Sequence, residues 1–179
     1  MMRRPVSCGL LFLMLSVSAL AGGPAEIVET SGVRGGLVVV IGVDDVDTLA
    51  AYRVNNSYLV HGLDTDSEKV AAVRRLLVEK GRYGTVSVDV FDGKTLPYID
   101  GLVNLVVSGG GSQVTEEEIE RVLAPRGVAL IGDKKSIKPV PPDIDDWGHF
   151  LYDPAAKNAS RDMVAYFPEH LQWEAGPLH

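Results

Sequence analysis

The stretch from Leu37 to Asp66 constrains the fold of this chain more than any other part. It begins with an unbroken apolar run, Leu37–Ile41, turns at Gly42, continues with helical spacing, and closes on a second apolar run that ends in Asp64. Two buried strands joined by a helix form a βαβ unit. Ligands of such units lie at the carboxyl ends of the strands, so the first turn and the acid after the second strand are candidate site residues.

The rest of the chain repeats this alternation of strands and helices. Further strands are expected at 86–91, 102–107 and 128–131, after a first and second strand at 37–41 and 58–63. Helices are expected at 47–54, from Asp66 or Ser67 to Gly81, and from Thr115 until Pro125 and Gly127. This pattern predicts an α/β fold, a doubly wound, Rossmann-like and mostly parallel sheet of order 3-2-1-4-5. A Pro-rich and aromatic C-terminal tail without periodicity follows and is expected to be extended.

Local signals specify some helix ends in more detail. Asp47 or Asp45 is expected to cap the helix at 47–54, whose apolar face would include Val54. Thr115 and Glu118 have the spacing of a capping box, in which the glutamate side chain reaches back to the start of the helix.

The N-terminus has the order of a secretory signal. Arg3 and Arg4 precede a short apolar stretch and then the small residues Ala19-Leu20-Ala21, so cleavage is expected after Ala21. The chain would then be exported, periplasmic or extracellular, with no stable membrane span; an uncleaved anchor is the alternative. The net charge of −7, with 24 acidic and 17 basic residues and no basic cluster, argues against nucleic acid as a partner.

Four motifs resemble those of class I S-adenosylmethionine-dependent methyltransferases. They are the turn after the first strand, the acid after the second, Asp92-Gly93 after the third, and the sequence from Arg121 to Gly127 before the fifth. The resemblance implies that S-adenosylmethionine is the cofactor and that its contacts come from Gly42, Asp44, Asp64, Asp92 and Gly93. From the residues alone, Asp64 fits a helix-capping acid as well as a ribose acceptor. An Asp-Gly pair such as Asp92-Gly93 after a strand is more often a simple turn than an adenine contact.

The resemblance breaks at the glycine-rich turn that holds the cofactor in this family. The glycine positions read Gly42, Asp44 and Val46, so two of three glycines are replaced by residues with side chains. An unpaired charge and a β-branched side chain would weaken binding about 100-fold or more. S-adenosylmethionine is also a cytoplasmic compound, whereas the signal directs this chain outside. Weak or absent catalysis is therefore expected, and the catalytic residues are unknown.

More narrowly, the chain is similar to the N-terminal region of exported bacterial proteins that join such a domain to a propeller with PQQ-like repeats. This divides it into a signal at 1–21, an exposed lead-in at 22–36 with a weak helical signal, the α/β domain at 37–132 and a linker-like tail at 133–179. The tail would contact a propeller domain or partner chain through Trp147, Phe150 and Trp173. A non-catalytic structural or interaction module is thus the alternative to a domain that binds a nucleoside-type ligand.

Other chemistries fit the sequence less well. Asp44, Asp45 and Asp47 lack the spacing of a calcium loop, so no metal site is expected. A dinucleotide-binding oxidoreductase would need a G-x-G-x-x-G turn, of which only Gly42 is present. His61 is expected to be a packed or edge histidine inside the second strand.

Overall fold

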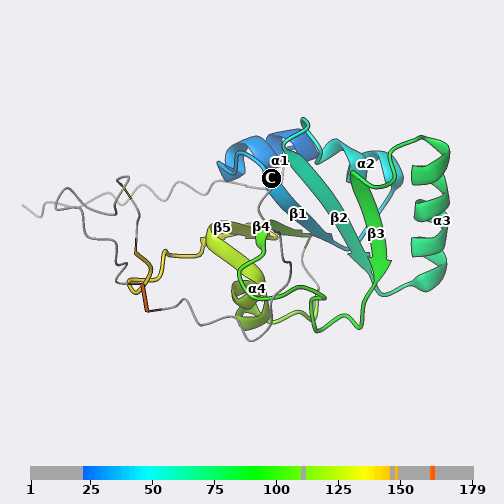
Figure 1. Cartoon of the computed structure of the whole chain (residues 1–179). Helices are drawn as coiled ribbons and strands as arrows, with labels where there is room; N and C mark the ends of the chain where they lie inside the picture. Colours follow the sequence, from blue (N-terminus) through cyan, green and yellow to red (C-terminus); the bar gives the residue numbers. More distant parts are fainter. Residues whose placement is uncertain (1–21, 110–111, 146–147, 149–161, 164–179) are drawn as a thin grey trace, which may run out of the picture. The chain divides into compact units, whose positions relative to one another are not determined.

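The computed structural model describes residues 22–109, 112–145, 148 and 162–163 (Figure 1). The chain divides into two compact units, Met1–Ile137 and Lys138–His179. The predicted signal at 1–21 and the predicted contact residues Trp147, Phe150 and Trp173 lie outside the described residues. The described part of the second unit includes a turn, in which the Ile144 amide donates to the Pro141 carbonyl at 3.3 Å.

The first unit is built on one six-stranded sheet. Its strands follow the order β3-β2-β1-β4-β5-β6, and β6 alone runs antiparallel to its neighbour. The predicted Rossmann-like sheet of order 3-2-1-4-5 is confirmed and is extended by one strand. The strands are β1 (Gly36–Ile41), β2 (Tyr58–Asp64), β3 (Val86–Val90), β4 (Val103–Ser108), β5 (Leu123–Ile131) and β6 (Lys134–Ile137).

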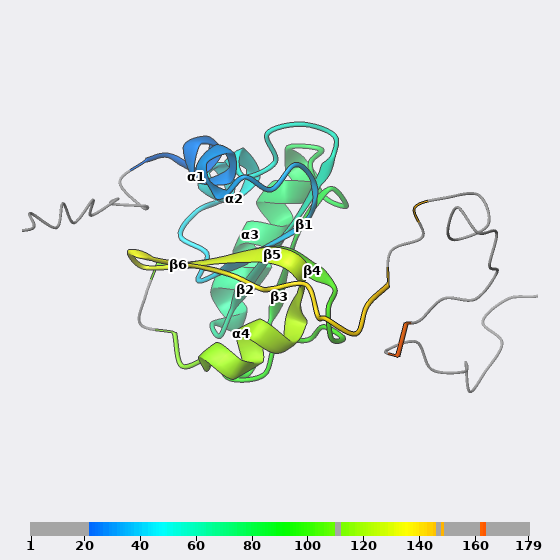
Figure 2. The same ribbon diagram turned by 90° about the vertical axis from the view of Figure 1, so that its left-hand side faces the viewer.

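Helices cover both faces of the sheet. They are α1 (Pro24–Ser31), α2 (Val46–Ala51), α3 (Ser67–Glu79) and α4 (Glu116–Val122). Residues of α1, α2 and α3 share one hydrophobic cluster, and residues of α4 belong to a second cluster on the opposite face (Figure 2). β1 contributes Val38 and Val40 to the first cluster and Val39 and Ile41 to the second, which explains its continuous apolar sequence.

The lead-in at 22–36 is not exposed as expected. α1 forms there with Pro24 at its first turn, and Ile27 and Val28 are buried at 5% and 1% exposure. Lys135 of β6 donates from Nζ to the carbonyl oxygens of Thr30 and Ser31, at 2.9 and 3.1 Å, and so satisfies the carboxyl end of this helix. α1 is therefore an integral part of the first unit.

Three local expectations were wrong in detail. α2 begins at Val46, one residue earlier than predicted, and Val54 lies outside it with 48% of its surface exposed. Glu118 does not reach back to the start of α4, because its Oε1 accepts from the Leu96 amide at 2.7 Å and its carboxylate pairs with Arg121. The start of the tail is not a loop, because Lys134–Ile137 forms the strand β6, which pairs with β5.

No described helix is both long and apolar enough to cross a membrane.

Candidate functional site

The turn after β1 is held against the end of β2 by backbone and side-chain hydrogen bonds. Gly42 has φ +83°, a left-handed conformation that favours glycine, and its amide donates to the Leu63 carbonyl at 2.8 Å. The next amide, of Val43, donates to Oδ2 of Asp64 at 3.0 Å. Gly42 and Asp64, two of the cofactor-binding residues that the resemblance implies, therefore lie side by side.

The carboxylate of Asp64 is almost buried and has several partners. Oδ2 also pairs with Nζ of Lys69 at 2.9 Å, and Oδ1 accepts from the Asp66 amide at 3.1 Å. Burial raises the pKa of Asp64, but the hydrogen bonds from Val43 and Lys69 outweigh it, so the pKa lies below its ordinary value. Asp64 is thus ionised at neutral pH, and Oδ1 keeps room for a further donor.

A cavity opens beside this turn at the carboxyl ends of the central strands. Its volume is about 360 Å³, within the range of small-ligand sites. It contains four of the five predicted cofactor-binding residues, since Asp44 is not among its lining side chains. The lining residues are Ile41, Gly42, Asp64, Thr65, Phe91, Asp92, Gly93, Ser108, Ser112 and Gln113.

Asp92 and Gly93 form the turn that their sequence pattern suggests. Oδ1 of Asp92 accepts from the amides of Lys94 and Thr95 at 2.8 and 2.7 Å, and these bonds hold the pKa of Asp92 below its ordinary value. Gly93 has φ +81°, and a Cβ there would lie 3.1 Å from Cγ2 of Thr65. The turn geometry therefore brings Asp92 to the cavity with both backbone amides bound to its Oδ1.

A second, smaller cavity of about 130 Å³ lies at the same turn. It shares Ile41 and Gly42 with the first and is the place to which the structure brings Asp44. Asp44 is exposed and forms no ion pair with the described residues. The other lining residues are Val40, Val43, Thr48, Leu49, Tyr52, Val107 and Gly109.

Asp45, one of the two predicted caps, closes the start of α2. Its Oδ1 accepts from the amides of Asp47 and Thr48, both at 2.9 Å, and the bond from the Thr48 hydroxyl is the main reason that its pKa is lowered. Val46, at the third position of the degenerate glycine turn, is buried with 6% exposure. It belongs to the core that anchors α2 and does not line either cavity.

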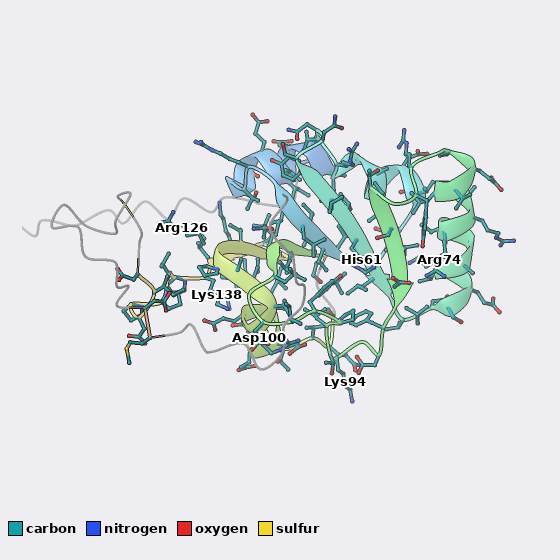
Figure 3. The ribbon with its side chains drawn as sticks, in the orientation of Figure 1. His61, Arg74, Lys94, Asp100, Arg126 and Lys138 are labelled. Atoms are coloured by element: carbon teal, nitrogen blue, oxygen red, sulfur yellow. The ribbon has the colours of Figure 1, made fainter. Side chains whose placement is uncertain are left out.

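His61 is a packed histidine, as predicted, and both of its ring nitrogens have partners. Nδ1 lies 2.7 Å from the Tyr98 hydroxyl, and Nε2 lies 3.1 Å from Oδ2 of Asp89. Arg74 pairs with the other oxygen of Asp89, and Figure 3 shows His61 and Arg74 on either side of β3. Burial, then the charge of Asp89, raises the pKa of Tyr98. This cluster ties β2, β3 and the following loop together and leaves no imidazole nitrogen for a substrate.

Two further side chains have structural roles. Asn104, at the start of β4, accepts from the Leu37 amide at 2.9 Å, so it lies at the opposite end of the strands from the cavities. Arg121 of α4 binds the Tyr98 carbonyl at 2.9 Å and pairs with Asp100 at 2.6 Å, which fastens the loop between β3 and β4. Within the described part of the chain, no group of His, Cys, Asp or Glu has the arrangement of a metal site.

Sequence reasoning missed the roles of Lys69 and Tyr52. Lys69 lies five residues after Asp64, a spacing that places it in the first turn of α3 and above the end of β2. Capping of α3 by Asp66, whose Oδ1 accepts from the Lys69 amide at 3.2 Å, fixes that placement, and Asp66 was one of the two residues, with Ser67, expected at the start of this helix. Tyr52 follows α2 with no sequence signal for a site role, and only the fold brings it to the smaller cavity.

The fold is shared with solved methyltransferases. A SAM-dependent methyltransferase from Aquifex aeolicus is 19% identical, with a TM-score of 0.51 over 60% of this chain and 62% of that one. Geranyl diphosphate C-methyltransferase from Streptomyces coelicolor A3(2), solved with Mg²⁺, geranyl diphosphate and S-adenosyl-L-homocysteine, is 16% identical, with a TM-score of 0.51 over 59% and 42%. Geranyl diphosphate methyltransferase in complex with SAM is 18% identical, with a TM-score of 0.52 over 59% and 46%.

The chain therefore has a methyltransferase-like Rossmann fold. It spans about half the length of the solved structures that it matches. Comparison of the sequence with protein families and with curated proteins finds no match.

Proposed function

We propose that this chain is an exported methyltransferase-like domain that binds an adenosine-type ligand weakly at the ends of its strands. The observation that carries the proposal is the cavity of about 360 Å³ that brings together Gly42, Asp64 and Asp92. Asp64 offers a carboxylate acceptor to a ribose hydroxyl, and Asp92 offers an acceptor to an adenine amine. Phe91 and Thr65 supply apolar atoms to the same lining, as a nucleobase requires.

The same geometry favours binding over methyl transfer. Lys69 already occupies one oxygen of Asp64, so a ribose must use the remaining acceptor positions or displace the lysine. Among the described residues, neither cavity is lined by His, Lys, Arg or Cys, which are the usual bases and nucleophiles other than carboxylates. Asp64 and Asp92 are both held in ionised form by backbone amides. The described residues that line the two cavities therefore offer only the carboxylates of Asp44, Asp64 and Asp92 as usual acceptors for a proton from a methyl acceptor.

Isothermal titration with adenosine tests this proposal. For the chain from Gly22 to His179, a dissociation constant of about 0.1 to 1 mM is expected, because few polar contacts are available and one carboxylate is partly occupied. Asp64→Asn is expected to weaken binding at least about tenfold, since it removes the charge that accepts hydrogen bonds from the ribose.

Asp47→Asn is the matched control for that titration. Asp47 is exposed, pairs with Lys80 at 2.6 Å, and lines neither cavity, so its replacement should leave the affinity unchanged within about twofold. Circular dichroism establishes that both variants are folded at the temperature of the titration. Equal binding by the wild type and Asp64→Asn, or no heat with adenosine, contradicts the proposal.

Export follows from the order of basic, apolar and small residues before Gly22. N-terminal sequencing of the protein recovered from the medium or periplasm of a bacterial host should begin at Gly22. An intact Met1 in membrane fractions would indicate the uncleaved anchor instead.

A structural or interaction module is the second candidate function. The favouring observation is that the Asp64 carboxylate is engaged by Val43, Asp66 and Lys69, as a purely structural acid would be. In this alternative the tail contacts a PQQ-like propeller domain or a partner chain through Trp147, Phe150 and Trp173. Absence of adenosine binding, together with a stable complex formed through the tail, would establish it.

A further inference from the structure

The smaller cavity bears on which adenosine derivative the site takes, an inference that rests on the proposed function. It adjoins the larger cavity at Ile41 and Gly42, so a ligand whose adenosine lies in the larger one directs its 5′ substituent toward the smaller. Asp44 is the only charged residue among the described residues that line this smaller cavity. The charge that the 5′ substituent meets is therefore negative.

Four backbone amides that could receive an anion at this place are already engaged. The first-turn amides of Asp47 and Thr48 donate to the carboxylate of Asp45. The Val43 amide donates to Asp64 and the Gly42 amide to the Leu63 carbonyl. A ligand carboxylate at this place would lie beside the carboxylate of Asp44 while these donors are occupied. Two like charges close together without a neutralising partner repel each other, which is unfavourable for binding.

A cation finds complementary groups in the same place. Asp44 is exposed and forms no ion pair with the described residues, so it is available to pair with an ammonium group. The aromatic ring of Tyr52 belongs to the lining, and aromatic rings favour cations over anions. Burial, then the charge of Asp44, raises the pKa of Tyr52, in agreement with their common place in the lining.

We propose that the site selects an adenosine derivative whose 5′ substituent ends in a cationic amine and discriminates against one that carries a carboxylate. Asp44 is then a residue that determines specificity. The replacement of glycine by aspartate at this turn changes the preferred ligand and does not simply close the site.

Two ligands that differ only in the carboxylate test this inference. S-adenosylhomocysteine has an amino and a carboxylate group at the end of its 5′ chain, and S-adenosyl-3-thiopropylamine is the same molecule without the carboxylate. The wild-type chain from Gly22 is expected to bind the thiopropylamine at least about tenfold more tightly than S-adenosylhomocysteine. Asp44→Asn is expected to reduce this ratio to about threefold or less, because it keeps the shape of the turn and removes the charge.

Controls separate this inference from the proposed function beneath it. Asp47→Asn removes the same charge from an exposed position outside both linings and should keep the wild-type ratio. Adenosine binding with equal affinities for the two ligands, or with S-adenosylhomocysteine preferred, overturns the selectivity and leaves the proposed function standing. If adenosine and both ligands fail to bind, the proposed function and the selectivity are both overturned. A preference that persists unchanged in Asp44→Asn overturns the role of Asp44.

Discussion

Replacing Val46 with glycine is expected to lower the free energy of unfolding by about 3 kcal/mol. Val46 is the first residue of α2, is 6% exposed and packs in the same core as Leu49 and Val60. Removing its side chain loses the burial of a valine, and glycine adds the conformational entropy cost of a flexible residue at a helix start. Urea denaturation at neutral pH measures the change.

Val54→Gly is the matched control for Val46→Gly. Val54 has 48% of its surface exposed, so the same exchange should cost at most about 1 kcal/mol. If Val46→Gly is as mild as Val54→Gly, Val46 is not the core residue that the structure describes. The expected result also means that restoring glycine at position 46 removes an anchor of α2 and is a poor way to restore a glycine-rich cofactor turn.

Gly62→Ala is expected to destabilise the chain by about 2 to 3 kcal/mol, because Gly62 of β2 packs against side chains of the turn after β1 and of α2. A Cβ at this position would lie 2.7 Å from Cγ2 of Val43 and 3.0 Å from Cδ2 of Leu49. Overpacking of this kind forces side chains and backbone to shift. Since the Val43 amide holds Asp64, the shift should also disturb the candidate site.

A double-mutant cycle with Val43→Ala isolates the contact behind that effect. Val43→Ala alone leaves a cavity and destabilises the chain by about 1 to 2 kcal/mol. In the double variant the new methyl group occupies part of this cavity, so the combined loss should be smaller than the sum of the single losses by at least about 1 kcal/mol. Strictly additive losses would show that Gly62 and Val43 do not meet as described.

The regular part of the fold was predictable because its signals are local. A continuous apolar run identified β1, which is buried on both faces, and the alternation of strands with helices predicted the parallel order. Thr115, and Asp66 as one of two candidates with Ser67, were predicted at helix starts from their positions before amphipathic segments. Each of these signals depends on residues that are close in sequence.

The parts that escaped prediction depend on contacts distant in sequence. β6 has one apolar residue, Ile137, and no periodicity, so only its pairing with β5 makes it a strand. Glu118 has the spacing of a capping box, but the Leu96 amide, 22 residues away, takes its side chain. Val46 and Gly62 acquire their roles from packing of α2 on the sheet.

The candidate site likewise has residues whose place was predictable from sequence and residues whose place was not. Gly42, Asp64, Asp92 and Gly93 follow strands whose parallel order was predicted, so their convergence on one cavity follows from that order. Asp44 was expected with them but lines the smaller cavity, which shares Ile41 and Gly42 with the larger one. The spacing of five residues puts Lys69 near the end of β2, but the pairing of its Nζ with Asp64 was not predicted because it depends on the side-chain conformation in the folded chain.

Adenosine binding at the strand ends is the central claim, and the most direct measurement follows backbone amide chemical shifts during an adenosine titration of the chain from Gly22. The account predicts saturable shifts that are largest at Gly42, Thr65 and Gly93, which line the cavity of about 360 Å³, and that are strongly reduced in Asp64→Asn. Shifts confined to residues outside this cavity, or no shifts at about 5 mM adenosine, would contradict it.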